Sequence, residues 1–518
     1  MSFFDEVVPE IKVSAVPGKI VFSPEQEAIF SAISKTSRSL IVIAKAGSGK
    51  TFTILESAKR VPAGQKIAFM AFNKDIADEL KRRIPRDVAT AVTINSLGNS
   101  SIRKAMPKAE FDELKLFKLY SKVERLLGLS KDFSKNNKRT ILNLVKIGKT
   151  NGITPNLKLI KKKFLEDTPQ NWKKFFFEYS LKCENGDLDK IVEVASVITK
   201  ESLKIAQNMT YDYTDQIVMP VLYGWECPKF DIIYLDETQD ISDIKLELVL
   251  SARHEKSRII AVGDPNQSIY GFAGARRSIL DKIKTQFNCL EFTLTRTFRC
   301  AKSIVLEANR VVPDIKALDT APDGLVKVIP DADPEKHVLV NDMVVCRTNA
   351  PLMTLAIRLF TMGTPFSFRG NEEFIQKAQE ILKGARGMSG SQVAEACKET
   401  IKALKESLNE GVNVSGDLDV ANFIKSIGEA NPTLSETQLI RKITEVFSSS
   451  KAGGSAVQLY TIHKAKGLEA DRVFFLNAHE IPHERAKSEW ELEQEENMRY
   501  VAITRAKREL YYIKIDSE

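Results

Sequence analysis

RSLIVIAKAGSGKTFTILESAKR, residues 38–60, is the stretch that decides the fold of this chain. It joins an apolar run rich in β-branched residues, a glycine-rich loop and a helical pattern, which predicts a strand, a tight turn and a helix. Gly47 and Gly49 allow backbone N–H groups to approach an anion closely, and Lys50 places a positive charge beside them. We therefore interpret the stretch as a phosphate-binding loop.

The chemistry of this loop implies a nucleotide and a metal ion. Lys50 can reach the β and γ oxygens of ATP, and the Thr51 hydroxyl can ligate magnesium. We therefore expect ATP and Mg²⁺ as cofactors, although the strict pattern has glycine where this chain has Ala44. The loop residues expected to contact the nucleotide are Ala46, Gly47, Ser48, Gly49, Lys50, Thr51 and Phe52.

Short apolar runs that alternate with helical patterns recur along the whole chain. They predict an α/β protein with two mostly parallel sheets, each covered by helices on both faces. Before residue 290 these runs are KIAFMAFN (66–73), FDIIYLD (230–236) and RIIAVGD (258–264). After it they are LEFTLT, DMVVCR (342–347), VQLYTIH (457–463), DRVFFLN (471–477) and ELYYIKI (509–515).

Two stretches lack this alternation and are mainly helical. In the second, Val393, Cys397, Ile401, Leu404 and Leu408 fall on one helical face, and SETQ at 435–438 predicts a capping box before another helix. The predicted organisation is two lobes with one helical insertion in each. The first lobe comprises 1–98 and 226–290 around a basic insertion at 99–225, and the second comprises 291–373 and 451–518 around a short insertion at 374–450.

Composition excludes several classes of protein. A chain of 518 residues predicts two to four domains. No apolar run approaches the roughly 20 residues that span a bilayer, and the N-terminus MSFFDEVVPE is acidic where a secretion signal is basic. The six cysteines are widely spaced without a CxxC pair, which argues against a zinc site and against disulfides. We expect a cytoplasmic or nucleoid-associated protein that is neither secreted nor bound to a membrane.

Positive charge is concentrated in the first insertion. Residues 101–200 hold 22 Lys and Arg against 12 Asp and Glu, whereas the whole chain has a net charge of +8. Aromatic residues interleave with this charge in KKKFLED and NWKKFFFEYS. Such a block suits a nucleic-acid backbone, and the alternative is a solvated helical surface with its aromatics in a core.

Two acidic residues complete a nucleotide site. Asp236 follows the apolar run IIYL within LDETQD (235–240), so it is expected at the carboxyl edge of the sheet, where α/β proteins bind ligands. Asp236 is expected to hold the magnesium shell together with Thr51, and Glu237 to polarise an attacking water. Surface carboxylates are the alternative for this pair.

Three further residues are candidates for contact with the γ-phosphate. Gln267 in GDPNQSIYG follows another predicted strand. Arg299 in TFRC and Arg505 in YVAITRA are candidate arginine fingers, because planar cations stabilise the charge that grows on a transferring phosphoryl group. Since Arg505 lies near the far end of the chain from Lys50, we expect two lobes to share one nucleotide.

In this order, these motifs resemble a superfamily 1A DNA helicase of the UvrD/Rep/PcrA type. The wording of AFNK, GDPNQSIYGFAGA and HKAKGLE is closest to the F-box helicase branch. The resemblance implies two RecA-like lobes that translocate on single-stranded DNA in the 3′→5′ direction and unwind junctions of single and double strands. Proteins of replication, repair or recombination are the partner class it implies.

The resemblance also implies roles for individual residues. Gln26, Phe298 and Glu469 would join the loop residues in holding the nucleotide. Phe72, Tyr270 and Phe272 would stack on DNA bases. The complete set implied to contact DNA is Phe72, Asn73, Thr93, Asn95, Tyr270, Phe272, Thr461 and His463.

Some residues depart from the pattern of that family. Lys45 replaces a glycine, Asn95 a histidine, Phe272 a tryptophan, Ala273 an arginine, and Phe52 an arginine that stacks on adenine. Three functions stay open on the sequence alone: a helicase, a translocase that strips proteins from single strands with little unwinding, and a nucleotide-switched DNA-binding module. The complete set of phosphate-facing residues argues against the third.

Overall fold

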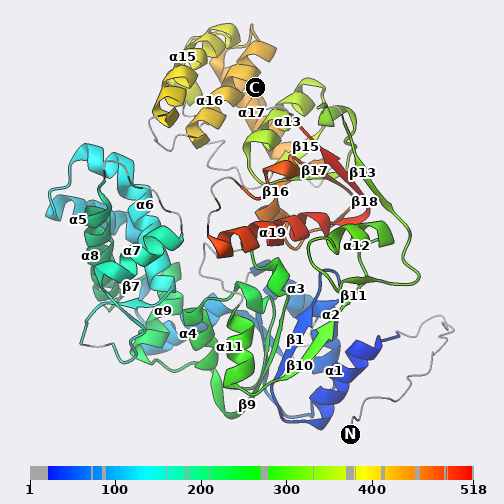
Figure 1. Ribbon diagram of the computed structural model, residues 1–518. Coiled ribbons are helices and arrows are strands. Elements are labelled where there is room, and N and C mark those ends of the chain that lie inside the picture. Colours follow the sequence, from blue (N-terminus) through cyan, green and yellow to red (C-terminus); the bar gives the residue numbers. More distant parts are fainter. Residues whose placement is uncertain are drawn as a thin grey trace.

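Two parallel six-stranded sheets form the centre of the protein in the computed structural model (Figure 1). In the first sheet the strand order is β10-β1-β9-β8-β2-β3, and in the second it is β13-β18-β17-β14-β16-β15. The predicted α/β class with two parallel lobes is confirmed. The structure describes residues 21–71, 74–83, 89–158, 160–179, 181, 183, 186–207, 209–269, 278–330, 332–368, 378–379, 381–409, 415–449, 455–483, 486 and 488–515.

The first sheet is apolar on both faces. Its strands are β1 (Leu40–Ala44), β2 (Ile67–Ala71), β3 (Thr90–Thr93), β8 (Phe230–Leu235), β9 (Arg253–Gly263) and β10 (Leu290–Leu294). Successive residues of a strand point to opposite faces, so Leu40 and Val42 enter one core whereas Ile41 enters the other. The helices on the Leu40 face are α1 (Pro24–Lys35), α2 (Lys50–Ala58) and α3 (Lys74–Arg83), and those opposite are α4 (Ile94–Ala105), α9 (Tyr213–Tyr223), α10 (Asp243–Leu250) and α11 (Ser278–Gln286).

The second sheet has the same two-sided construction. Its strands are β13 (Leu325–Val328), β14 (Met343–Cys346), β15 (Phe366–Phe368), β16 (Val457–Thr461), β17 (Ala470–Leu476) and β18 (Ala506–Ile513). One face packs on α13 (Ala350–Thr361), and the other packs on α12 (Lys302–Ala308), α18 (Ile462–Ala465) and α19 (Glu489–Ile503). The core on the α19 face also contains Ala46 and Ile269 of the first lobe. The two lobes therefore meet through a continuous apolar contact, with α19 along their boundary (Figure 1).

The predicted boundary between the lobes at residue 290 was wrong by one strand. LEFTLT was assigned to the second lobe, but β10 pairs in parallel with β1 along its whole length, from Leu40 with Leu290 to Ala44 with Leu294. A local apolar pattern predicts that a strand forms but not which sheet it joins, because the sheet depends on pairing with residues far away in the sequence.

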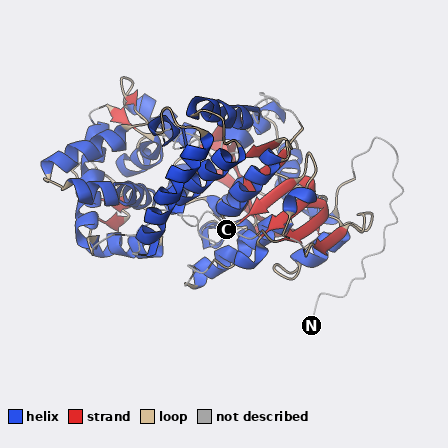
Figure 2. Ribbon diagram, turned by 90° about the horizontal axis from the view of Figure 1, so that it is seen from above, coloured by secondary structure: helices blue, strands red, loops and turns tan. Residues whose placement is uncertain are grey.

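The first insertion has a core of its own. The helices that build this core span a shorter stretch than the predicted 99–225. This core is built by α5 (Lys115–Leu126), α6 (Lys131–Thr150), α7 (Pro169–Glu178) and α8 (Leu188–Gln207). Helices α4 and α9 instead bury their apolar residues in the first lobe. They cross so closely that a Cβ at Gly98 would lie 1.7 Å from the Gln216 carbonyl oxygen, so only glycine fits there. Seen from above, the insertion helices lie beside the part of the molecule that holds most of the strands (Figure 2).

The second insertion shares its core with the second lobe. Its helices are α15 (Gly390–Asn409), α16 (Ser415–Ala430) and α17 (Glu436–Ser449), and α16 packs on α13. Val393, Cys397 and Ile401 are buried as the periodicity predicted, whereas the side chain of Leu408 lies outside the described residues. Ser435 and Gln438 form the predicted capping interactions, at 2.9 Å from the Ser435 N–H to Gln438 Oε1. None of the described helices combines the length and the apolar character needed to cross a membrane.

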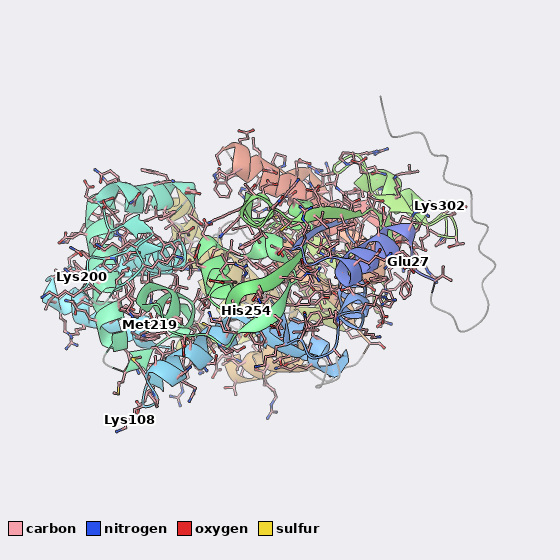
Figure 3. The ribbon with its side chains drawn as sticks, turned by 90° about the horizontal axis from the view of Figure 1, so that it is seen from below. Glu27, Lys108, Lys200, Met219, His254 and Lys302 are labelled. Atoms are coloured by element: carbon pink, nitrogen blue, oxygen red, sulfur yellow. The ribbon has the colours of Figure 1, made fainter. Side chains whose placement is uncertain are left out.

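A buried ion cluster ties the first insertion to α9. Asp215 on α9 accepts hydrogen bonds from Lys115 on α5, at 2.6 Å, and from Lys149 on α6, at 2.7 Å. All three side chains are almost completely buried, and Ser202 on α8 accepts from both lysines. The exposed Lys108 and Lys200, in contrast, extend from the surface of the insertion, and Met219 of α9 lies inside (Figure 3).

Replacing Asp215 with asparagine should destabilise the protein strongly. The change leaves two buried ammonium groups with Asp212 as their remaining carboxylate, at 3.7 Å from Lys149. Breaking a buried pair from one side typically costs about 3–5 kcal/mol. Urea denaturation measures this, and Asp112→Asn, which removes the partner of the exposed Lys118 in the same insertion, is the matched control that should change stability little. Equal stabilities of the two variants would contradict a central role for the cluster.

Candidate active site

A cavity of about 640 Å³ lies where the phosphate loop meets the second lobe. That volume is in the range of small-molecule and cofactor sites. Residues of both lobes line it, among them the six that were predicted to act on the phosphates or the attacking water: Lys50, Asp236, Glu237, Gln267, Arg299 and Arg505. Its lining comprises Gly47, Ser48, Gly49, Lys50, Thr51, Phe52, Asp236, Glu237, Gln267, Phe298, Arg299, Gly467, Glu469, Arg505 and Lys507.

The second lobe packs directly on the phosphate loop. Gly47 has a positive φ of 69°, and its carbonyl accepts a hydrogen bond of 2.8 Å from the N–H of Phe298. A Cβ at Gly47 would lie 2.4 Å from Thr297 Oγ1 and 2.6 Å from Arg299 Cβ. Glycine is therefore required here for the approach of the other lobe as well as for the turn of the loop.

Lys50 is paired with a carboxylate of the same lobe. Its Nζ lies 3.1 Å from Glu237 Oε1. Burial opposes the charge on Glu237, but the charges of Lys50 and Lys466 lower the pKa of Glu237 to about 2. Burial, reinforced by the charge of Glu237, raises the pKa of Asp236 to about 6. Glu237 therefore stays ionised at neutral pH, as a residue that polarises water must.

Thr51 and Asp236 form a pair suited to magnesium. The Thr51 hydroxyl lies 3.5 Å from Asp236 Oδ2, at the point where β8 ends. A hydroxyl, a carboxylate, phosphate oxygens and waters are the oxygen ligands that Mg²⁺ takes. A cation there would also favour the ionised form of Asp236, whose buried carboxyl has no direct ion pair in the described part of the chain. The residues present thus fit the ion.

Arg299 reaches the cavity from the second lobe. Its Nε donates to Glu469 Oε2 at 2.6 Å, and its Nη1 donates to the Thr504 carbonyl at 3.1 Å. Lys507 binds the other oxygen of Glu469 at 2.8 Å. One carboxylate therefore holds two cations at the edge of the cavity, where an incoming nucleotide would compete for them.

Arg505 is a buried cation whose hydrogen bonds, in the described part of the chain, go to neutral acceptors. It is 1% exposed, and it donates to the carbonyls of Val501 and Leu468 and to the Thr504 hydroxyl. Burial and the neighbouring Arg299 lower the pKa of Arg505 to about 9. No carboxylate among the described residues forms an ion pair with it. Because a buried charge is costly unless it is paired, Arg505 is placed to receive an anion.

Of the other residues predicted to contact the nucleotide, Phe298 and Ser48 line the cavity, whereas Gln26 and Ala46 do not. The ring of Phe298 is 51% exposed beside the cavity, as stacking requires. Ser48 Oγ lines the cavity and is buried without a partner among the described residues. Gln26 does not line the cavity, because its carboxamide binds Ser23 N at 2.9 Å and Thr53 Oγ1 at 3.0 Å. The Ala46 N–H is also engaged, by the Tyr500 hydroxyl at 3.0 Å.

The sequence analysis missed the residues that join the lobes around this cavity. Lys466 Nζ lies 2.5 Å from Asp240 Oδ2 and 2.6 Å from the Gln267 carbonyl oxygen, and the Lys466 side chain is only 7% exposed. Tyr500 and Asn497 on α19 contact Ala46 and Ser268 of the first lobe. The motifs TIHKAKGLE and YVAITRA contain Lys466 and Tyr500 and thus mark these segments as functional. No local pattern, however, indicates which residues of the first lobe Lys466 and Tyr500 contact.

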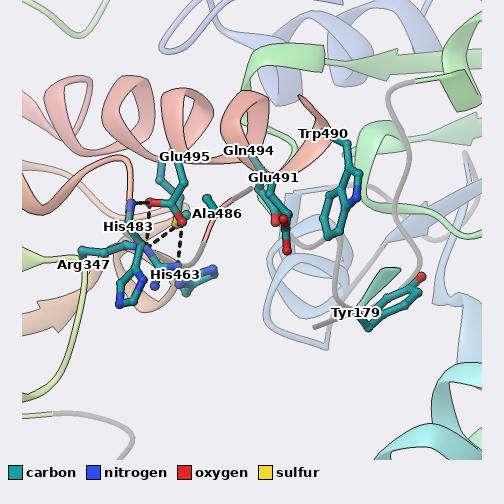
Figure 4. Close-up of a pocket in the computed structure, with 10 residues that line it drawn as sticks. Tyr179, Arg347, His463, His483, Ala486, Trp490, Glu491, Gln494 and Glu495 are labelled. Carbon is teal, nitrogen blue, oxygen red and sulfur yellow. Dashed lines mark hydrogen bonds and ion pairs between the residues drawn. The ribbon is translucent and has the colours of Figure 1, made fainter. Parts of the chain in front are cut away.

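A second cavity of about 470 Å³ lies between the first insertion and the second lobe. At one end Arg347 forms a bidentate ion pair with Glu495, at 2.7 and 3.0 Å, beside His463 and His483, while Trp490 and Tyr179 lie at the other end (Figure 4). Burial, followed by the charge of Arg347, lowers the pKa of His463 to about 4. A neutral imidazole can contact a ligand there through a hydrogen bond but not through charge.

The predicted DNA contacts are placed only in part. Thr93 ends β3 and caps α4, and Thr461 ends β16 and caps α18, so both lie at the carboxyl edges of their sheets. The Asn95 amide is used internally, donating to the Tyr213 carbonyl and to Gln216 Oε1, both at 3.1 Å. Phe72, Asn73, Tyr270 and Phe272 lie outside the described residues.

Comparisons with known proteins agree with this construction. The model of the UvrD/REP helicase N-terminal domain matches residues 23–288, and that of the UvrD-like helicase C-terminal domain matches residues 375–517. F-box DNA helicase protein 1 of Schizosaccharomyces pombe is 28% identical over 94% of this chain and 56% of its own length. The ATP-dependent DNA helicase PcrA of Bacillus subtilis is 22% identical over 93% of this chain and 81% of its own length.

Two further matches are more limited. F-box DNA helicase 1 of Gallus gallus is 23% identical over 95% of this chain, and the chain spans about half the length of these F-box relatives. A solved arterivirus helicase, nonstructural protein 10, aligns with a TM-score of 0.33 at 10% identity over 94% of this chain and 61% of its own, too weak a likeness to support an argument. The resemblance predicted from the motifs is confirmed by the two family models, and the chain belongs to the UvrD/REP helicase family.

Proposed function

We propose that this chain is an ATP-dependent DNA helicase that moves 3′→5′ on single-stranded DNA and unwinds duplex. The observation that supports this most is the position of Arg505, a buried cation of the second lobe that forms no ion pair with any described residue and lines the same cavity as Lys50 of the first. Such a cavity is complete only when both lobes contribute, so hydrolysis of ATP within it changes how the lobes are held together. Movement on DNA follows from that change.

In the proposed reaction the chain's own residues bind and orient ATP. Lys50 would leave Glu237 for the β and γ oxygens, while Arg299 and Arg505 would approach the γ-phosphate from the second lobe. Glu237 would orient the attacking water, and Thr51 and Asp236 would hold Mg²⁺, which supplies charge neutralisation at the phosphates when bound. The exposed ring of Phe298 would stack on the adenine. Single-stranded DNA would cross the carboxyl edges of both sheets, past Thr93, Thr461 and the cavity around His463.

The first insertion supplies a surface for the DNA backbone. Lys131, Lys135, Arg139 and Lys146 are exposed on one face of α6, and no carboxylate in the described part of the chain pairs with them. At 1.5 Å per residue this stripe extends about 22 Å along the helix. Unpaired cations in a row suit the phosphates of DNA, and DNA as substrate supports a location in the cytoplasm or nucleoid.

The direction of movement is tested with tailed duplexes. We expect displacement of the duplex strand from a substrate with a 3′ single-stranded tail and little from one with a 5′ tail, in the presence of ATP and Mg²⁺. Displacement from the 5′-tailed substrate alone would refute the polarity. A translocase with little unwinding would show DNA-stimulated hydrolysis and removal of a bound protein block without displacement of either duplex.

Arg505→Lys should behave as a loss of function. A guanidinium contacts two phosphate oxygens at once, and an ammonium group does not reproduce this geometry. We expect modestly weaker ATP binding and a DNA-stimulated turnover reduced on the order of 10³-fold, the low end for an arginine finger. Lys50→Ala is the inactive reference, and turnover within about threefold of the parent would make Arg505 a structural residue.

The basic stripe on α6 should determine the salt dependence of DNA binding. Removing two phosphate contacts in Lys135→Gln/Arg139→Gln should make the slope of log K against log salt shallower by about 1.4–1.8. Fluorescence anisotropy with a labelled tailed duplex measures this slope. Lys383→Gln/Lys402→Gln removes the same charge from the second insertion and should leave the slope unchanged. Equal slopes for both double variants would contradict the assignment of the surface.

A further inference from the structure

Lys45 connects the phosphate loop to a turn of the first lobe from outside the nucleotide cavity. It follows β1 directly, and its N–H donates to the Leu294 carbonyl at 2.9 Å. Its Nζ donates to Asn266 Oδ1 at 3.3 Å and does not line the cavity. This lysine departs from the family pattern, and no role above includes it.

The turn that Lys45 meets is the 3₁₀ segment Pro265–Gln267, which is built around the carboxylate of Asp264. Asp264 Oδ1 accepts from the Asn266 N–H at 3.1 Å, and Oδ2 accepts from Gln267 Nε2 at 2.7 Å. The Gln267 side chain lines the nucleotide cavity. The Gln267 amide nitrogen is therefore directed to Asp264, and it would have to leave this carboxylate to bind a phosphate.

Asp264 depends on nearby cations because it is fully buried. Burial raises its pKa, and the charges of Lys50 and then Lys45 oppose this rise. The hydroxyl of Tyr500, from α19, is a further titratable group near it. In the proposed reaction, ATP in the cavity would attract Lys50 to its phosphates and Gln267 to its γ-phosphate. Asp264 would then lose its strongest cation and one hydrogen bond at the same step.

We propose that Lys45 is a positioning residue, which holds the Asp264–Gln267 turn against the phosphate loop through Asn266 while Gln267 turns to the nucleotide. The inference rests on the proposed function, since it takes ATP as the occupant of the cavity. Lys45 acts through Asn266 and Asp264 and touches no substrate. Its loss should therefore affect turnover and the order of the turn more than the affinity for ATP.

The test is a double-mutant cycle of Lys45 and Asn266. Lys45→Met removes the charge, Asn266→Ala removes its hydrogen-bond acceptor, and Lys45→Arg keeps a donor of equal charge. We expect the first two each to lower DNA-stimulated kcat about tenfold with the KM for ATP within about threefold, and the double variant to lose little more than either single one. Lys45→Arg should restore most of the activity. Lys59→Met, which removes an exposed lysine just beyond α2, is the control and should match the parent.

A second measurement does not depend on hydrolysis. Hydrogen exchange of the backbone amides at positions 266 and 267 in the nucleotide-free protein should be faster in Lys45→Met and in the double variant, and unchanged in Lys45→Arg and Lys59→Met. Additive losses in the cycle, or parental exchange in Lys45→Met, would overturn the inference. A raised KM with unchanged kcat would also overturn it, by making Lys45 a phosphate ligand. An inactive parent protein would refute the proposed function instead, while the exchange measurement would still test the contact.

Discussion

The contact between the phosphate loop and the second lobe is the constraint on which the rest of the structure depends. Gly47 lies so close to Thr297 and Arg299 that no Cβ fits between them, and the Ala46 N–H is bound by Tyr500. The same lobe supplies Lys466, whose ammonium group contacts both Asp240 and the Gln267 carbonyl. Residues of both lobes line the cavity, so a ligand that fills it is in reach of both.

The charges around the cavity explain why a bound nucleotide would change the ion pairs of both lobes. Lys50 is paired with Glu237, Arg299 is paired with Glu469, and Arg505 donates its hydrogen bonds to carbonyls and a hydroxyl among the described residues. Bound triphosphate offers these cations a common partner, and Mg²⁺ offers one to Asp236. The pair of Lys50 with Glu237 lies within the first lobe and that of Arg299 with Glu469 within the second, and both would be exchanged for contacts with one shared ligand, so each cycle of hydrolysis would make and break a link between the lobes. This is the physical basis that we propose for coupling ATP hydrolysis to movement on DNA.

Local patterns were sufficient to predict most of the strands, the phosphate loop, and Asp236 and Gln267 after their strands. Arg299 and Arg505 were identified from their motifs instead, because Arg505 precedes β18 and Arg299 follows a two-residue strand outside both six-stranded sheets. Local patterns did not indicate that β10 joins the first sheet, since its pairing with β1 links residues far apart in sequence. They also did not indicate that Gln26 and Asn95 are engaged by neighbours, because Thr53 and Tyr213 approach them only in the folded chain. The Asp215 cluster was missed for the same reason, as three helices bring its members together.

The central claim is that one nucleotide is held by both lobes at once. The most direct measurement is an experimental structure with a non-hydrolysable ATP analogue and Mg²⁺. The account predicts a γ-phosphate within hydrogen-bond distance of Lys50, Arg299 and Arg505, with Lys50 released from Glu237 and Gln267 turned away from Asp264. An analogue bound to the phosphate loop alone, with Arg299 still on Glu469 and Arg505 still on its backbone carbonyls, would contradict it.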